Sequence, residues 1–284
     1  MHLSIVIPAK NEAASLPALV TEIARLYPEA EVLVVDDGST DSTASTALAA
    51  GARVISHPYS KGNGAAIKTG ARHASGEIIV FMDADGQHRP RDIAILLDDM
   101  NDNIDMVVGA RHAGGQASLA RRLANSLYNN LASWMTGQTV EDLTSGFRAV
   151  RRDRFREFIH LLPNGFSYPT TITMSFFRAG YSVIYRTIDV QKRTEGTTSH
   201  ISLGRDGFRF FLIIFKVGTL YSPLKLFLPV SVTFFLFGSA YYAYTYLSDG
   251  RFTNMGALLF ITSILVFLIG LVSEQITALM YKDE

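Results

Sequence analysis

Two long uncharged stretches near the end of the chain constrain its fold more than any other feature. They cover Leu226–Leu247 and Met255–Ser273, and few charged residues follow Lys225. As a helix, each stretch is long enough to cross the hydrocarbon core of a bilayer. Because only the short linker Ser248–Asn254 separates them, the sequence predicts an antiparallel hairpin of two membrane-spanning helices.

The residues that flank these stretches predict how the chain lies at the membrane. Basic residues precede the first span and Lys282 follows the second, against only Arg251 in the linker, so both termini are expected in the cytosol. Residues 201–223 mix aromatic and basic side chains, which is typical of an amphipathic helix on anionic headgroups; a core helix is the alternative. We therefore expect an inner-membrane or ER-type membrane protein with two spans and a cytosolic catalytic domain.

The first half of the chain alternates short apolar runs with segments of helical spacing. Pro8 is expected to end the first apolar run, and Pro17 suits the first turn of the helix that follows. Such alternation is typical of an α/β, doubly wound and mostly parallel sheet. The predicted strands are 3–7, 31–35, 53–56, 77–82 and 105–109, and the predicted helices are 13–26, 42–50 and 64–74, with an amphipathic helix around Trp134.

Asp83 and Asp85 come directly after the fourth predicted strand. Ligands of open α/β sheets bind outside the carboxyl ends of the strands. Two carboxylates at this spacing suit Mg²⁺ or Mn²⁺, which leaves room for water and substrate phosphates. A solvated acidic turn would show the same residues. Polar residues at the ends of neighbouring strands favour a nucleotide-diphosphate site instead.

Those polar residues end the first and second predicted strands. Glu12 follows the first, and Asp36 and Asp37 end the second, where an acidic side chain suits a ribose hydroxyl or a base edge. Turn formation and helix capping use the same residue types. Lys61–Gly64 precedes a helix, so its backbone N–H groups and Lys61 could face a phosphate. A P-loop is absent from the sequence, which argues against an NTPase.

Composition excludes several other classes. The 26 basic and 26 acidic residues balance, so no global field indicates a nucleic-acid partner. Cysteine is absent, which excludes disulfides, thiolate nucleophiles and Cys–zinc sites. The histidines lack the spacing of a zinc enzyme. Met1–Pro8 has no basic region and only a short apolar run, so a cleavable signal peptide is not expected.

Five segments together resemble glycosyltransferase family 2, whose catalytic domain has the GT-A fold. They are IVIPAKNE (5–12), VVDDGSTDST (34–43), KGNGAAIKTG (61–70), FMDADGQHRP (81–90) and TSGFRAVRR (144–152). The pattern is most similar to polyprenyl-phosphate hexosyltransferases of the dolichol-phosphate mannose synthase type. The resemblance implies inverting, Mg²⁺- or Mn²⁺-dependent transfer of a hexose from a UDP- or GDP-sugar to undecaprenyl or dolichyl phosphate. The QxxRW motif of processive synthases is absent, which argues against polysaccharide elongation.

The resemblance also implies a set of site residues. Asp85 and Gln87 would be the protein ligands of the metal, and Arg111, Arg122 and Arg193 would hold donor or acceptor phosphates. The nucleotide, ribose and diphosphate would lie against Pro8, Ala9, Glu12, Val35, Asp37, Asp83 and Ala84. Apart from the resemblance, Lys61 and Lys68 could assist the donor or could be ordinary surface lysines.

A phosphate acceptor sets particular demands on the protein. Polyprenyl phosphate is already ionised at pH 7 and needs little help from a general base. It does need cations, and arginine binds two phosphate oxygens at once. The basic residues available are Arg111, Arg121, Arg122, Arg148, Arg151, Arg152 and Arg193; a positive face near anionic lipid is the alternative reading.

Asp142 lies where inverting enzymes of the GT-A fold place a catalytic carboxylate. It could act as a base, or it could orient Arg148 or Arg193, and the ionised acceptor favours orientation. Ser145–Phe147 is expected to form a tight turn that brings backbone near the sugar. Residues 193–199 have the polarity and glycine of a loop that closes over the donor.

These features predict three regions: a GT-A catalytic domain over 1–200, an interfacial helix over 201–223 and a two-span anchor over 224–284. A homo-oligomer is compatible with the sequence. One alternative is a glycolipid synthase that transfers sugar to a lipid hydroxyl, for which Asp142 would have to be a base. A nucleotidyltransferase would need a glycine-rich N-terminal loop that this chain lacks. A non-catalytic sugar-nucleotide-binding membrane protein is a further alternative, against which intact Asp83, Asp85 and Gln87 argue.

Overall fold

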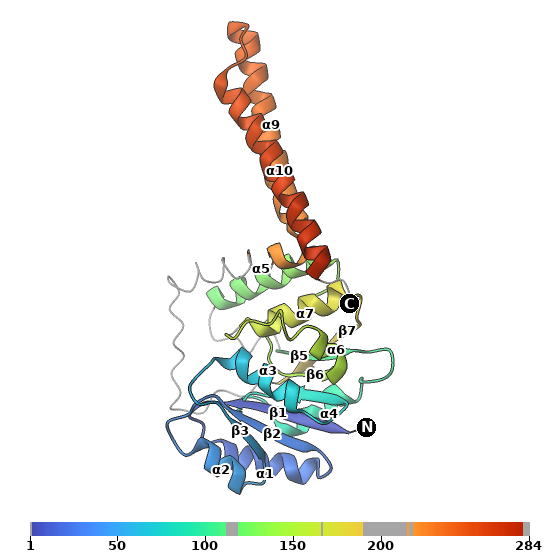
Figure 1. Cartoon of the computed structure of the whole chain (residues 1–284). Helices are drawn as coiled ribbons and strands as arrows, with labels where there is room; N and C mark the ends of the chain where they lie inside the picture. Colours follow the sequence, from blue (N-terminus) through green and yellow to red (C-terminus); the bar gives the residue numbers. More distant parts are fainter. Residues whose placement is uncertain (1, 112–118, 166, 190–214, 216–217, 281–284) are drawn as a thin grey trace. The chain divides into compact units, whose positions relative to one another are not determined.

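The computed structural model describes residues 2–111, 119–165, 167–189, 215 and 218–280, with the backbone alone at 119–125. The chain divides into two compact units, Met1–Ile201 and Ser202–Glu284. The first unit is built on a β-sheet with helices on both faces, and the second contains a pair of long helices (Figure 1).

The sheet has seven strands in the order β3-β2-β1-β4-β6-β5-β7. Only β6 runs antiparallel to its neighbours β4 and β5, whereas the other pairings are parallel. The predicted mostly parallel α/β sheet is therefore confirmed. The strands are β1 (Leu3–Ala9), β2 (Glu31–Asp36), β3 (Arg53–Ser56), β4 (Ile78–Phe81), β5 (Met106–Arg111), β6 (Arg148–Arg151) and β7 (Val183–Ile188).

Helices cover both faces of this sheet (Figure 1). On one face, α1 (Leu16–Leu26), α2 (Thr43–Ala49) and α4 (Ile93–Leu97), which follows the short 3₁₀ helix η1 (Pro90–Asp92), contribute to one continuous apolar core. On the other face lie α3 (Asn63–His73) and α6 (Arg152–Glu157), and α7 (Tyr168–Arg178) packs near α6 while α5 (Leu119–Thr136) packs on α7. The apolar runs are continuous rather than alternating because both faces are buried.

The first strand continues past Pro8, where the sequence predicted its end. Pro8 pairs with Val35 and Ala9 with Asp36, whereas pairing with β4 stops at Val6. The carbonyl of Val6 accepts a hydrogen bond from an amide on the side of β4, and the carbonyl of Ala9 accepts one from the amide of residue 37 on the side of β2. Because successive residues of a strand direct their backbone groups to alternate sides, the nitrogen of Pro8 faces the side of β4. Its missing N–H costs nothing there because that edge is already unpaired.

The first predicted helix begins three residues later than predicted, whereas the next two agree closely with the structure. Observed α1 begins at Leu16 instead of residue 13, because Ser15 N and Leu16 N both donate to Glu12 O and close a turn first. Pro17 occupies the first turn, as predicted. Observed α2 and α3 agree with the prediction to within one residue at each end.

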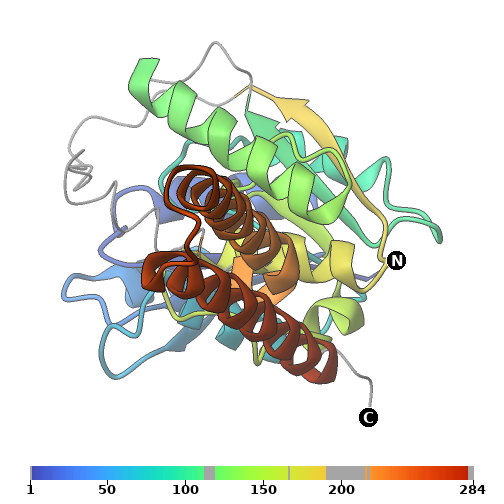
Figure 2. The same cartoon turned by 90° about the horizontal axis from the view of Figure 1, so that it is seen from above.

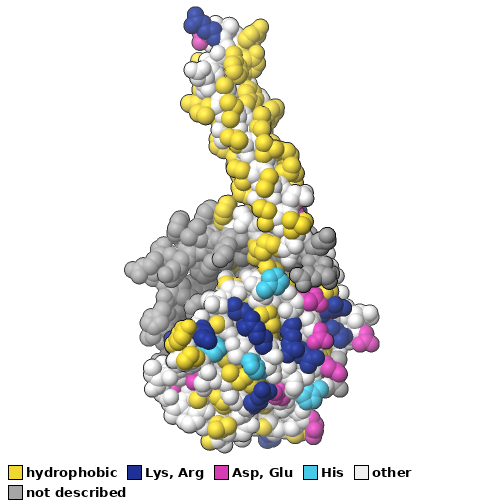
Figure 3. Space-filling model, in the orientation of Figure 1, with side chains coloured by type: hydrophobic (Ala, Val, Ile, Leu, Met, Phe, Trp, Pro, Cys, Tyr) yellow, Lys and Arg dark blue, Asp and Glu magenta, His cyan; other side chains and the backbone are white. Residues whose placement is uncertain are grey.

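The second unit contains α9 (Pro223–Asp249) and α10 (Asn254–Met280), both long and apolar enough to cross a membrane. They run side by side (Figure 2), and apolar side chains cover their visible face (Figure 3). The predicted hairpin of two apolar helices is confirmed. The predicted interfacial helix (201–223) and the loop 193–199 with Arg193 fall largely or wholly outside the described residues.

Small residues at seven-residue spacing form the contact between α9 and α10. The buried positions include Ser231, Gly238 and Thr245 on α9, and Gly256, Ser263, Gly270 and Thr277 on α10. Ser231 and Ser263 each donate a side-chain hydrogen bond of 2.9 Å to the backbone carbonyl of the other. Close approach over small residues and interhelical hydrogen bonds stabilise helix pairs in a membrane, where burial of apolar surface contributes little.

Candidate active site

The acidic and polar residues singled out from the sequence gather at the carboxyl ends of β1, β2, β4 and β5. The loops after β1 and β2 are cross-linked: Glu12 N donates to Thr43 Oγ1 (2.9 Å), and Asn11 N donates to Ser39 Oγ (2.9 Å). Asn11 has φ of 56°, a conformation that asparagine tolerates better than most residues. The first two loops therefore form one connected rim.

Asp37 is the anchor of a second loop. Its Oδ1 accepts from His57 Nδ1 (2.7 Å) and Lys61 N (2.8 Å), and its Oδ2 accepts from Ser60 Oγ (2.8 Å) and Gly62 N (2.8 Å). Burial by itself raises the pKa of Asp37, but these donors outweigh burial and lower the pKa to about 2. The carboxylate is ionised, buried and fully hydrogen-bonded within the protein, so in this structure it shapes the loop after β3.

This arrangement corrects the prediction that the backbone N–H groups of Lys61–Gly64 could face a phosphate for two of the four groups. Those of Lys61 and Gly62 donate to Asp37 instead. A Cβ on Gly62 would lie 2.4 Å from Asn164 O, and a Cβ on Gly64 would lie 2.2 Å from a neighbouring carbonyl oxygen. The glycines are needed because the loop before α7 approaches the start of α3 this closely.

The other residues implied for the nucleotide lie at or near strand ends. Pro8 and Ala9 end β1 and are buried, and Glu12 is half-buried and accepts from Ser15 Oγ (2.9 Å). Val35 has no exposed side-chain surface, because it packs beneath α3 close to Gly70. A nucleotide contact at Val35 would therefore have to come from the backbone.

Asp83 and Asp85 follow β4 and are half-buried, with Ala84 buried between them. Asp85 Oδ1 accepts from Gln87 N (3.1 Å), so the loop turns back on itself and the backbone of Gln87 lies beside Asp85. The predicted pair is thus neither a fully solvated turn nor a buried ion cluster. Its oxygens lie at the rim, where a ligand can reach them.

The loop of residues 142–147 packs against Asp83 and His88. A Cβ on Gly146 would lie 3.1 Å from Asp83 Oδ2, and Phe147 stacks on His88 with ring centroids 4.8 Å apart. Ser145 Oγ donates to Gly109 O of β5 (2.6 Å). The predicted tight turn at 145–147 is wrong, because the turn residues are 143 and 144 and the segment 145–147 leads directly into β6. The prediction that a sugar lies near this backbone stays a prediction, but the segment does lie beside Asp83.

Arg111 and Asp142 form a bidentate ion pair at the end of β5. Arg111 Nε donates to Asp142 Oδ2 (2.8 Å) and Nη2 to Oδ1 (3.0 Å), and Nη2 also donates to Thr144 Oγ1 (2.5 Å). Burial by itself raises the pKa of Asp142, but the hydrogen bonds and charge of Arg111 hold it below its ordinary value. Asp142 is therefore a weak base that pairs with Arg111. Of the two partners that the sequence suggested, Arg148 forms no ion pair with it, and Arg193 lies outside the described residues.

Three of the arginines that the sequence offered as available cations lie away from the site. Arg148 is 0% exposed in the interior of the domain. Arg151 and Arg152 stand at the far end of β6, where they donate to backbone carbonyls of Asn101 and Ser75. The reason is the antiparallel direction of β6, which carries the end of this segment away from the site. Arg122 is in α5, but its side chain lies outside the described residues.

The residues present fit a divalent cation that is held together with a diphosphate. In the described part of the chain, no group of three or more His, Cys, Asp or Glu side chains could hold a metal by itself. Mg²⁺ in nucleotide sites is commonly bound by one or two carboxylates, with waters and substrate phosphates completing the shell. Asp83 and Asp85 supply such carboxylates, and Gln87 adds an amide oxygen within the same loop.

Sequence reasoning missed three residues of this region. His57 links Asp37 to Thr69 (2.9 Å), Tyr168 OH donates to Gly146 O (3.3 Å), and His88 is buried with its Nδ1 unpartnered. Burial lowers the pKa of His88 to about 4 despite the neighbouring charge of Asp85. The position of His57 directly after a strand was a usable signal, whereas nothing local marks Tyr168.

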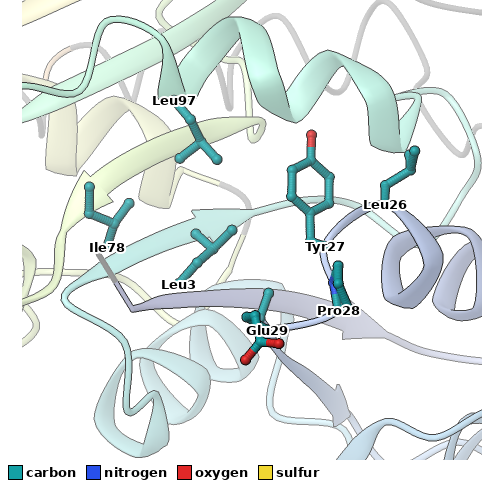
Figure 4. A pocket seen from close by; sticks show the side chains of 8 residues that line it. Leu3, Leu26, Tyr27, Pro28, Glu29, Ile78 and Leu97 are labelled. Carbon is teal, nitrogen blue, oxygen red and sulfur yellow. The ribbon is translucent and has the colours of Figure 1, made fainter.

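A pocket of about 340 Å³ lies away from this site (Figure 4). It is lined mainly by apolar side chains, among them Leu3 and Ile78 at the first residues of β1 and β4. It therefore opens at the amino ends of these strands, opposite the edge that carries Asp83 and Asp85.

Comparisons with known proteins agree with this geometry. The model of the family "Glycosyl transferase family 2" matches residues 4–159, and the model "GtrB C-terminal hairpin" matches residues 222–279. A glucosyl-3-phosphoglycerate synthase structure from Mycobacterium tuberculosis, solved with Mn²⁺, UDP and phosphoglyceric acid, superposes with a TM-score of 0.61. It is 24% identical, and the match covers 76% of this chain and 77% of that one, so it shows the fold alone.

Relatives with similar sequences include three named transferases. Polyprenol monophosphomannose synthase of Mycolicibacterium smegmatis is 30% identical over 209 residues (68% of this chain, 79% of the relative). Glycosyltransferase AglJ of Haloferax volcanii is 29% identical over 245 residues (85% and 77%). Undecaprenyl-phosphate 4-deoxy-4-formamido-L-arabinose transferase of Salmonella choleraesuis is 37% identical over 160 residues, which cover 53% of this chain but only 49% of the relative.

The family match spans more than half of the chain and includes the strands and loops that form the site. It confirms the predicted GT-A-like fold and enzyme class, and the hairpin match together with α9 and α10 indicates membrane association. The chain is a member of glycosyl transferase family 2 with a GtrB-type C-terminal hairpin.

Proposed function

We propose that this enzyme transfers a hexose from a UDP- or GDP-hexose to a polyprenyl phosphate, with inversion at the anomeric carbon. An oxygen of the lipid phosphate forms the new bond to that carbon, and the bond to the nucleotide diphosphate breaks, which gives polyprenyl-phosphate hexose and NDP. The observation that carries the proposal is the juxtaposition of Asp83 and Asp85 with the Arg111–Asp142 ion pair through the loop 142–147. Two of the similar relatives are named as polyprenol or undecaprenyl-phosphate transferases.

The donor would bind at the rim formed by β1, β2 and β4. In this proposal Pro8, Ala9 and Glu12 contact the nucleotide, and Asp37 acts by holding the loop that carries Lys61. Asp83, Asp85 and Gln87 would hold Mg²⁺ or Mn²⁺ together with the diphosphate. The cation would neutralise the charge that develops on the leaving NDP.

The acceptor would approach Arg111 from the open side of the site. The Arg111 side chain is 35% exposed even though Asp142 holds it in a bidentate pair, so its guanidinium can still reach a phosphate. In the proposal Arg122 and Arg193 complete the phosphate site, and Asp142 orients Arg111. Because the pKa of Asp142 is lowered, it is a poor base, which favours an ionised phosphate acceptor over a lipid hydroxyl.

The hairpin would fix the enzyme in the membrane that contains the lipid acceptor. Four basic residues precede the first span (Arg205, Arg209, Lys216 and Lys225), and Lys282 follows the second. This asymmetry favours a cytosolic catalytic unit and cytosolic termini. In the cytosol, the catalytic unit would also have access to nucleotide sugars. A domain without cysteine is compatible with that compartment.

Transfer of labelled sugar by the purified full-length protein tests the proposal. The assay combines undecaprenyl or dolichyl phosphate, Mn²⁺ or Mg²⁺ and a panel of UDP- and GDP-hexoses, and it measures label in an organic-extractable, acid-labile lipid. Asp85→Ala should abolish product, whereas Asp102→Ala, an exposed carboxylate on another loop, should not. Product with a lipid alcohol such as diacylglycerol but none with polyprenyl phosphate would contradict the proposed acceptor.

A further inference from the structure

Arg148 is an arginine in the deep interior of the catalytic unit. It is 0% exposed and is the largest of the fully buried side chains. Its guanidinium donates to Pro169 O (3.3 Å), Thr173 Oγ1 (3.1 Å) and Ser145 O. All these acceptors are neutral, and its Nε has no hydrogen-bond partner. No carboxylate of the described residues forms a salt bridge with it.

Burying an arginine without a counter-ion destabilises the folded protein, so a functional benefit of the charge is expected. Arginine stays protonated in proteins, and a buried charge without a counter-ion is strongly unfavourable. Hydrogen bonds to backbone carbonyls recover part of this cost, but a neutral side chain of similar volume would avoid it altogether. The benefit of a charge at this position must therefore come from the anions on which it acts.

The carboxylates whose charges act on this guanidinium are Asp142 and Asp83. The segment 145–147 connects them to it. Arg148 donates to Ser145 O, and the next residue, Gly146, lies beside Asp83, where a Cβ would come within 3.1 Å of Asp83 Oδ2. Tyr168 reinforces the connection, because its ring lies 5.9 Å from the guanidinium and its OH donates to Gly146 O.

We propose that Arg148 is a positioning residue that supplies a buried positive charge beneath the donor site. It fixes the segment 145–147 beside Asp83 and partly offsets the negative charge of Asp83 and Asp142. The site is thereby tuned to bind the anionic nucleotide diphosphate together with its cation, at the expense of binding a free divalent cation. This inference rests on the proposed donor and metal site.

The proposal predicts opposite changes in two affinities. Removing or neutralising the buried charge makes the site more negative, so free Mn²⁺ should bind roughly threefold to tenfold more tightly. UDP or GDP, measured at saturating Mn²⁺, should bind more weakly by a similar factor, roughly threefold to tenfold. If Arg148 had a purely structural role, its loss would weaken the binding of Mn²⁺ and of the nucleotide alike, because displacement of the segment 145–147 would disturb every contact of the site.

An isosteric pair of substitutions at Thr173 gives the sharpest test. Thr173→Asp would place a carboxylate on the guanidinium and neutralise its field without removing it, whereas Thr173→Asn adds no charge. Mn²⁺ affinity is measured by electron paramagnetic resonance, and UDP and GDP affinity by calorimetry, on the full-length protein in detergent. Thr173→Asp should tighten Mn²⁺ and weaken the nucleotide relative to Thr173→Asn.

Substitution of Arg148 itself gives the second test. Arg148→Met should change both affinities in the same directions, and Arg148→Lys should restore Mn²⁺ affinity towards the wild-type value. Arg156→Met is the matched control, because Arg156, like Arg148, donates only to neutral acceptors, in its case backbone carbonyls at the end of α3. It should lower the thermal stability and leave Mn²⁺ affinity unchanged.

The two levels of the inference fail in distinguishable ways. If the wild-type protein binds neither Mn²⁺ nor nucleotide, or if Asp85→Ala leaves both unchanged, the proposed function fails and this inference fails with it. If the wild type binds both and Thr173→Asp matches Thr173→Asn, the electrostatic role of Arg148 is refuted. Should Arg148→Met not fold, the Thr173 pair still decides.

Discussion

Asp37→Asn should destabilise the protein by an amount that depends on pH. The carboxylate accepts four hydrogen bonds within the domain, and its pKa is about 2 in the folded state. An unfolded aspartate titrates near 3.9, so the difference of roughly two units corresponds to about 2.5 kcal/mol of stability at pH 7. Asparagine can accept at only one of the two oxygen positions, and its NH₂ group would face donors at the other.

The sign of the pH dependence follows from the direction of the shift. Because the folded pKa is lower than the unfolded one, this stabilisation is fully present above the unfolded pKa and is lost as pH falls through the folded pKa. The stability deficit of the variant should therefore be about 2 to 3 kcal/mol at pH 7 and roughly half of that at pH 3.

Urea unfolding of the full-length protein in detergent measures this deficit, with the fluorescence of Trp134, the only tryptophan, as the probe. Asp153→Asn is the control, because that side chain is 80% exposed and its surface ion pair should contribute less than about 1 kcal/mol. Equal stability of wild type and Asp37→Asn at pH 7 would refute the reasoning. A deficit that stays constant down to pH 3 would show that the hydrogen-bond geometry, not the charge, stabilises the loop.

Three further substitutions test the site and the hairpin. Asp142→Asn should raise the KM for polyprenyl phosphate about tenfold and largely keep kcat, because it frees Arg111 rather than removing a base; a kcat loss of about 10²–10⁴ with KM unchanged would identify a general base. In Gly146→Ala, the new Cβ would lie 3.1 Å from Asp83 Oδ2, so Mn²⁺ binding should weaken several-fold, roughly 1 kcal/mol. Unchanged Mn²⁺ affinity would show that Gly146 does not lie against the Mn²⁺ site. Gly270→Leu, where a Cβ would lie 2.7 Å from a side chain of the facing helix, should lower the melting temperature in detergent, and an unchanged value would contradict the close packing of the hairpin.

Local patterns were sufficient for β1 to β5, for α1 to α3 and for the edge of the sheet that carries the site, whereas β6, β7, α4, α6 and α7 were not predicted. The strands β2, β3 and β4 have apolar centres, and each ends in or before a polar loop that the structure places at the same edge. The hairpin was equally readable, because an uncharged apolar stretch of about 20 residues is typical of a membrane-spanning helix. In both cases the information lies within neighbouring residues.

Long-range partners could not be predicted in this way. Arg148 and Arg111 look alike in the sequence, yet the first is buried under the site and the second lies at its rim. The difference arises from β6, which enters the sheet antiparallel between β4 and β5. Its insertion depends on which strand edges are left open, and that is a property of the whole sheet rather than of residues 148–151.

The distribution of charge allows this site to be both rigid and open. The buried charge of Asp37 is satisfied by four donors of the protein, whereas that of Arg148 meets only neutral acceptors, and each residue holds one loop, the first after β3 and the second before β6. The charges at the rim, on Asp83 and Arg111, remain partly exposed. Because the loops are fixed from beneath, the rim does not need a ligand to bring its groups together, and less binding energy is lost in ordering it. Donor and acceptor charges can therefore be received by groups that are already in place.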